Sequence, residues 1–127
     1  MDALNIAREN IVSLEMESYC DLIQADIQSV KFHPDRSFDT IVTNPPFGTR
    51  NRGIDTLFVE KAMSSANVVY SLHKRSTRDH FIRKASENDW NLEMVAELRY
   101  DLPKTHVFHK QKSKDIEVDL YRFSHQR

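Results

Sequence analysis

Stretches with apolar residues at helical spacing alternate along this chain with short apolar runs that are typical of strands. Helical spacing is found over residues 4–14, 54–62 and 81–85. Strands are predicted at residues 20–25, 38–42, 68–72, 92–98 and 116–121. Strands separated by helices imply a mainly parallel sheet with helices on its faces, and the last two strands can pair as a long antiparallel hairpin. The sequence therefore predicts an α/β fold.

Polar residues that can cap helices precede two of the predicted helices. Asp2 stands at the N-cap position of the first helix, and Ser76 or Thr77 can cap the third. Pro45 and Pro46 end the strand at residues 38–42 abruptly, because proline cannot donate to a sheet ladder.

Composition limits the class of protein. A chain of 127 residues, 39% hydrophobic and 29% charged, is expected to form one domain at most, and its net charge of -1 excludes a global attraction to nucleic acid. The single cysteine, Cys20, excludes an internal disulfide and a cysteine-based zinc site and favours a small buried side chain. With no apolar run near the roughly 20 residues that span a bilayer, we expect a soluble, intracellular protein with no membrane contact.

Four residues directly after the strand at 38–42 carry the clearest chemistry: Asn44, Pro45, Pro46 and Phe47. Open α/β sheets bind their ligands at the carboxyl ends of their strands. The side-chain oxygen of Asn44 and the main-chain oxygen of Pro45 can accept both hydrogens of an exocyclic amine, and Phe47 can stack on an extruded base. Such acceptors also stabilise the positive charge that develops on the nitrogen as it attacks a methyl group. The alternative is a simple strand terminator, since prolines and asparagine are common in turns.

At this point the sequence resembles a known family, the class I S-adenosylmethionine-dependent methyltransferases with an Asn-Pro-Pro-Phe motif that modify an adenosine of small-subunit ribosomal RNA. The resemblance rests on residues 44–49 (NPPFGT), 70–74 (YSLHK), 96–103 (AELRYDLP) and 115–120 (DIEVDL). It implies a Rossmann-like fold and transfer of a methyl group to the N6 amine of adenosine.

The same resemblance shows what the chain lacks. Members bind S-adenosylmethionine through a glycine-rich loop after the first strand, whereas the only glycines here, Gly48 and Gly53, follow the motif. Of the donor-binding positions, Asp26 and Ile27 match, together with Asn44, although Asp26 can also be a solvated loop residue. We therefore expect a single partial domain over residues 1–127 that lacks the first two strands, with residues 1–35 poorly packed.

Basic residues cluster in the connection between the last two strands and just after the motif. In an RNA-modifying context they are predicted to contact phosphates, although exposed charge runs are often only solvated. The predicted RNA-binding residues are Arg50, Arg52, Lys104, His106, His109, Lys110, Lys112 and Lys114.

Further expectations concern histidines and partners. His73 and Lys74 end a predicted strand and either border the base pocket or only close the strand. No metal site is expected, because no carboxylate or cysteine lies at ligand spacing from the histidines. The resemblance implies a heterodimer with a small zinc-binding methyltransferase activator that extends the sheet along residues 20–25.

Two other functions remain open from the sequence. One is a non-catalytic fragment that binds RNA or the activator, which the missing glycine-rich loop favours. The other is methylation of a protein glutamine side chain at N5, a reaction of related motifs with tyrosine in place of Phe47. The basic connection argues against the second.

Overall fold

The computed structural model describes residues 2–32, 38–46, 53–102 and 114–126 of the chain. The chain divides into two compact units, Met1–Val30 and Lys31–Arg127. Each unit is built around its own internal contacts. None of the described helices is long and apolar enough to cross a membrane.

Unit 1 contains the helix α1, Ala3–Ser13. Its predicted cap is confirmed, because the side chain of Asp2 accepts a hydrogen bond of 2.9 Å from the backbone N–H of Asn5. No residue of α1 is buried. The strand predicted at residues 20–25 is wrong, since this stretch has an irregular backbone and Cys20 is exposed rather than buried. The described residues of unit 1 include no other strand to supply the ladder that such a segment needs.

Unit 2 contains a four-stranded sheet in the order β1-β2-β4-β3. The strands are β1 (Phe38–Thr43), β2 (Ala66–Lys74), β3 (Trp90–Leu102) and β4 (Lys114–His125). β1 and β2 are parallel, whereas β4 is antiparallel to both of its neighbours. The predicted α/β class and the closing hairpin are confirmed. The sheet of the described residues is mixed rather than mainly parallel, because β4 inserts between β2 and β3.

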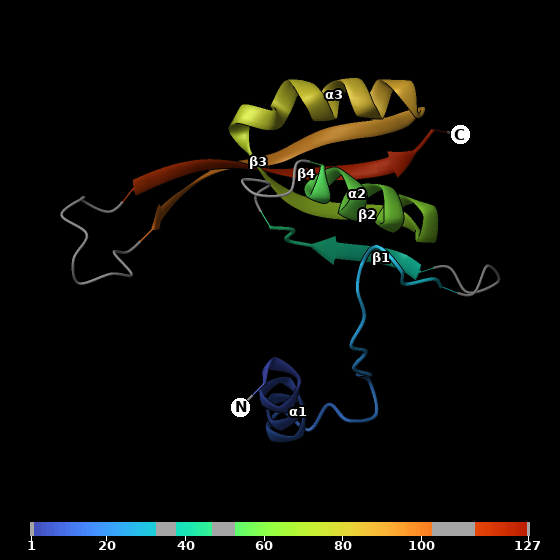
Figure 1. Ribbon diagram of the computed structural model, residues 1–127, viewed down its shortest axis with the longest axis vertical. Helices are drawn as coiled ribbons and strands as arrows, with labels where there is room; N and C mark the ends of the chain where they lie inside the picture. The colour runs from blue at the N-terminus through green and yellow to red at the C-terminus, as the bar shows by residue number, and fades with distance from the viewer. Residues whose placement is uncertain (1, 33–37, 47–52, 103–113, 127) are drawn as a thin grey trace. The chain divides into compact units, whose positions relative to one another are not determined.

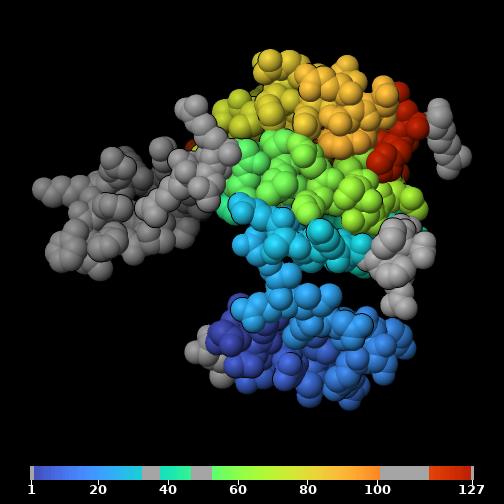
Figure 2. Space-filling view, turned by 45° about the vertical axis from the view of Figure 1, so that its right-hand side comes forward, coloured from blue at the N-terminus to red at the C-terminus, as the bar shows by residue number. Residues whose placement is uncertain are grey.

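Two helices of unit 2 pack on one face of this sheet: α2, Ile54–Ser65, and α3, Arg78–Glu87, which follows the short 3₁₀ turn Arg75–Thr77 (Figure 1). Their buried side chains join those of β2, β3 and β4 in a single apolar core. The largest fully buried side chains of this core are Tyr121, Phe81, Phe123 and Met63, and Trp90 is also a member. The side chains of the two helices form a continuous surface in Figure 2, and an ion pair of 2.8 Å between Lys84 and Glu60 joins them.

At the start of α3, the predicted cap residue has the expected position but makes a different hydrogen bond. Thr77 is its N-cap residue, as predicted, but the side chain makes no capping hydrogen bond. Its hydroxyl instead donates to the carbonyl of Lys74 at 2.7 Å. The threonine therefore fixes the tight turn between β2 and α3 rather than the first turn of the helix.

Candidate active site and its surroundings

The Asn-Pro-Pro motif lies where the sequence places it, at the carboxyl end of β1. Because β1 and β2 are parallel, with Thr43 paired to Ser71, their carboxyl ends meet at the same edge of the sheet. Asn44 is exposed directly beyond this edge, whereas Pro45 is buried and Pro46 is exposed. The buried proline anchors the turn and leaves the amide side chain of Asn44 open to solvent. Phe47 lies outside the described residues.

The connection that follows β1 ends at Gly53, where α2 begins. Gly53 is the N-cap residue and has a φ of 88°, a left-handed conformation that glycine adopts without steric cost. Asp55 follows in the first turn, where a negative charge is favourable to the helix dipole, and its Oδ1 accepts a hydrogen bond of 2.9 Å from the N–H of Thr56.

His73 links this helix start to the sheet. The imidazole is only 1% exposed, its Nε2 lies 2.6 Å from the hydroxyl of Ser71, and its ring centroid lies 4.0 Å from that of Phe81. Its Nδ1 has no hydrogen-bond partner and lies 3.7 Å from Oδ2 of Asp55, too far for a hydrogen bond. Burial lowers the pKa of His73 to about 4, although the nearby Asp55 carboxylate opposes the shift. His73 therefore belongs to the core, one residue before the end of β2, which agrees with the prediction that it closes the strand.

A second polar cluster lies on the same face of the sheet, beside the start of α3. The guanidinium of Arg78 donates two hydrogen bonds of 2.8 Å to the carboxylate of Asp119 and one of 2.6 Å to Glu97. Asp119 also accepts a hydrogen bond of 2.8 Å from the hydroxyl of Tyr121. The bonds from Arg78, and then that from Tyr121, hold the pKa of Asp119 below its usual range, whereas burial raises the pKa of Tyr121. This buried carboxylate is therefore fully paired and serves the fold.

The residues predicted to bind the methyl donor lie in different units. Asp26 is exposed in unit 1, where its Oδ1 accepts a hydrogen bond of 2.8 Å from the N–H of Gln28, and Ile27 beside it is half-buried. A carboxylate held in this way still offers Oδ2 as an acceptor, which suits the amine of an adenine ring. Because Asn44 lies in unit 2 and the other two residues lie in unit 1, a joint donor site of these three residues stays a prediction.

Most of the predicted RNA-binding residues lie outside the described part of the chain. These are Arg50, Arg52, Lys104, His106, His109, Lys110 and Lys112. Lys114 is the first residue of β4 and pairs with Leu102 of β3. Within the described ranges, no group of three or more histidine, cysteine, aspartate or glutamate residues is placed to hold a metal ion.

Comparison with known proteins relates this chain to methyltransferases. The family model described as "UPF0020: RMKL-like, methyltransferase domain" matches residues 1–55, which include the Asn-Pro-Pro-Phe motif. The rRNA N(6)-adenosine-methyltransferase METTL5 of Danio rerio is 50% identical over 127 residues, which are 97% of this chain and 60% of that protein. Mettl5 of Drosophila melanogaster, with the same description, is 48% identical over 96% of this chain and 58% of its own length. The chain thus spans about three-fifths of the length of these relatives.

Solved structures extend the comparison to the fold. The structure of a protein assigned as an RNA methyltransferase from Pyrococcus horikoshii has a TM-score of 0.80 at 27% identity, over 98% of this chain and 59% of that one. The 23S rRNA methyltransferase ErmE, at 15% identity, has a TM-score of 0.62 over 98% of this chain and 50% of its own, which shows the shared fold alone. These findings agree with the predicted resemblance: residues 1–55 match a methyltransferase-domain model, and the chain is similar to about three-fifths of the METTL5 relatives and of the Pyrococcus horikoshii structure.

Proposed function

We propose that this chain carries the part of an rRNA adenine-N6 methyltransferase that receives the target base, with S-adenosylmethionine as methyl donor. The observation that carries the proposal is the position of Asn44, exposed beyond the carboxyl end of β1 and followed by the buried Pro45. Support comes from relatives that are described as rRNA N(6)-adenosine-methyltransferases and are 44% to 50% identical.

The chemistry of the adenine amine explains why an amide and a carbonyl suit the task. Its lone pair is delocalised into the ring, so the amine is a poor nucleophile until acceptors bind both hydrogens and orient that pair. Asn44 Oδ1 and the carbonyl of Pro45 can supply these acceptors. Proline fixes its own φ, so little conformational freedom is lost when the base binds. The donor, when bound, supplies an electrophilic methyl group, and the two acceptors stabilise the charge that develops on the nitrogen.

Substitution of Asn44 tests this role in a chimaera in which residues 1–127 replace the matching three-fifths of the Danio rerio relative. Asn44→Ala is expected to lower methyl transfer to an adenosine-containing rRNA fragment by about 10²- to 10³-fold, the usual effect of removing one group that stabilises developing charge. RNA binding should stay within a few-fold of the parent. Methyl transfer that stayed within a few-fold of the parent would show that Asn44 is not an essential acceptor.

Asn67→Ala is the matched control. Asn67 is exposed near the start of β2, at the opposite end of this strand from the Asn44 edge. This variant also removes one side-chain amide, but at a position far along the strand from Asn44. Methyl transfer should therefore remain at the parent rate.

Donor binding separates an enzyme from a fragment that only binds RNA or a partner. Calorimetric titration of the purified chain with S-adenosylmethionine should give a measurable heat if Asp26, Ile27 and Asn44 suffice to hold the donor. The absence of heat would favour the non-catalytic alternative for this chain by itself.

The activator remains part of the proposal. We infer a small zinc-binding methyltransferase activator as the partner, together with location in nucleus and cytoplasm, from the family resemblance. The activator is predicted to bind along residues 20–25, which form no strand in unit 1. A partner that extends the sheet there would therefore have to induce a strand in this segment. Co-purification of the chimaera with such an activator tests the interaction.

A further inference from the structure

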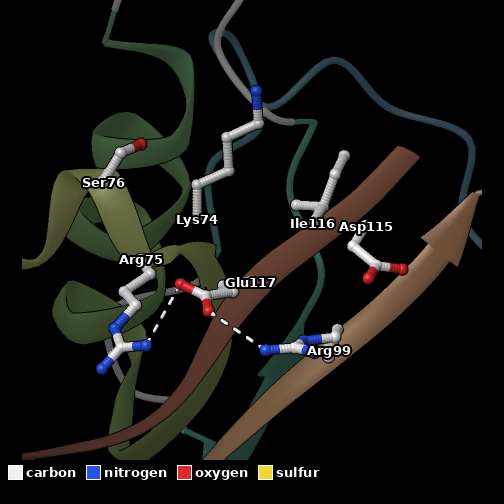
Figure 3. A pocket seen from close by; sticks show the side chains of 7 residues that line it. All are labelled: Lys74, Arg75, Ser76, Arg99, Asp115, Ile116 and Glu117. Atoms are coloured by element: carbon white, nitrogen blue, oxygen red, sulfur yellow. Dashed lines mark hydrogen bonds and ion pairs between the residues drawn. The ribbon is translucent and has the colours of Figure 1, made fainter.

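A pocket of about 500 Å³ lies beyond the carboxyl end of β2, where the β3–β4 hairpin passes the start of α3. Charged and polar side chains make up most of its wall: Lys74, Arg75, Ser76, Arg99, Asp115 and Glu117 (Figure 3). Three of these side chains are cationic and two are anionic. A wall of this kind suits a small anionic group rather than an apolar ligand.

The two arginines of this pocket share one carboxylate. Glu117 lies between Arg75 and Arg99 in Figure 3, at 3.1 Å from the first guanidinium and 3.6 Å from the second. All three side chains are well exposed: 45% for Arg75, 66% for Arg99 and 47% for Glu117. Exposed ion pairs contribute little net stability, so a phosphate can replace the Glu117 carboxylate at low cost.

The neighbouring ion pair of Arg78 and Asp119 differs from these exposed ion pairs because its carboxylate is buried. Asp119 has a fully buried side chain and binds Arg78 through both of its oxygens, so this arginine is committed to the fold. Arg75 also contacts Glu97 at 3.5 Å, whereas the only ion pair described for Arg99 is the long one to Glu117. Of the two arginines of the pocket, Arg99 is therefore the better able to bind a ligand.

The pocket and Asn44 lie at the same end of the sheet, beyond the carboxyl ends of β2 and β1. Thr43 pairs with Ser71 in the parallel ladder, and Lys74 follows Ser71 by three residues, about 10 Å along an extended strand. A nucleic-acid strand that presents a base to Asn44 can therefore reach Lys74 and the pocket within a few nucleotides.

We propose that this pocket binds a backbone phosphate of single-stranded RNA, with Arg99 and Arg75 exchanging Glu117 for the phosphate and Lys74 and Ser76 as further donors. The choice of RNA as the ligand rests on the proposed function. Arginine suits the exchange because its planar guanidinium binds phosphate through two parallel hydrogen bonds.

The test uses fluorescence anisotropy of a short labelled single-stranded RNA titrated with the chain over a series of salt concentrations. Arg99→Gln should weaken binding several-fold and reduce the slope of log K against log salt by about 0.7, the value for one phosphate contact on a single strand. Glu117→Gln should tighten binding several-fold, because it releases both guanidiniums from their carboxylate.

Matched controls lie on the same two strands, away from the pocket. Arg122 on β4 and Glu93 on β3 are partners in the hairpin register, and neither lines the pocket. Arg122→Gln and Glu93→Gln make the same charge changes and should alter RNA affinity by less than about two-fold, as expected for charges without a phosphate contact. Circular dichroism of all four variants verifies that the fold is retained.

Two results would overturn the proposal. If Arg99→Gln and Arg122→Gln weakened binding equally, RNA would respond to net charge and the pocket would not be a site. If Glu117→Gln failed to tighten binding, the exchange of carboxylate for phosphate would be wrong. Either result leaves the proposed function standing as long as methyl transfer by the chimaera depends on Asn44, because that assay measures chemistry and not the phosphate contact.

Discussion

Arg78 and Asp119 form a two-bonded ion pair, with both hydrogen bonds at 2.8 Å, between the first turn of α3 and the middle of β4. The side chain of Asp119 is fully buried, whereas that of Arg78 is 26% exposed. The pair therefore holds a carboxylate that the apolar core could not otherwise accept.

Removal of the arginine should strongly destabilise unit 2. Among the described residues, Arg78→Ala leaves the buried carboxylate with the hydroxyl of Tyr121 as its one hydrogen-bond partner, and we expect a loss of about 3 kcal/mol in the free energy of unfolding. Arg75→Ala is the control, because its ion pairs are exposed, and it should cost less than about 1 kcal/mol. Urea denaturation at neutral pH measures both. Equal costs for the two variants would contradict a special role for Arg78.

Acid should destabilise the fold through His73. Burial holds its pKa at about 4, below the ordinary value of 6.5, so the unfolded chain binds a proton that the folded chain does not bind between these two pH values. Stability is therefore lost as pH falls from 6.5 toward 4, by on the order of 3 kcal/mol for a shift of this size.

The variant His73→Gln isolates this effect, because glutamine does not titrate. Its unfolding free energy should fall less steeply between pH 6.5 and pH 4 than that of the parent chain. His80→Gln serves as the control, since His80 is exposed on α3 and its charge is only a minor cause of the lowered pKa of His73, so this variant should keep most of the parental dependence. A parental slope in His73→Gln would place the acid sensitivity elsewhere.

Gly53 should resist replacement for a conformational reason alone. Its φ is 88°, and a Cβ added there meets nothing within 4 Å. Gly53→Ala is expected to cost about 1 kcal/mol from the left-handed backbone, and Gly53→Asn should cost less, because asparagine tolerates this region better. Thermal unfolding of the two variants gives the comparison. A larger cost for asparagine would point to a steric cause.

The core beneath α3 should respond to loss of volume. Phe81 is fully buried among His73, Tyr121 and Phe123, so Phe81→Ala is expected to destabilise by about 3 to 5 kcal/mol. Ile82 is the next residue of the same helix and is 49% exposed, so Ile82→Ala should cost roughly 1 kcal/mol or less. Denaturant midpoints compare the two, and similar costs would show that α3 packs less tightly than its burial indicates.

The sequence by itself determined the elements whose signals are local. The 3.6-residue spacing of apolar side chains predicts α1, α2 and α3, the Asp2 cap is formed, and the motif Asn44–Pro46 follows β1 as the prolines require. These features depend on neighbours along the chain.

Tertiary structure decided what depends on partners distant in sequence. Residues 20–25 have the composition of a strand, but a strand exists only where another strand supplies its hydrogen bonds, and unit 1 as described has none. The insertion of β4 between β2 and β3 made the sheet mixed. His73 could not be assigned to the core, nor Arg75, Arg99 and Glu117 to one pocket, because these residues come together only through the strand register.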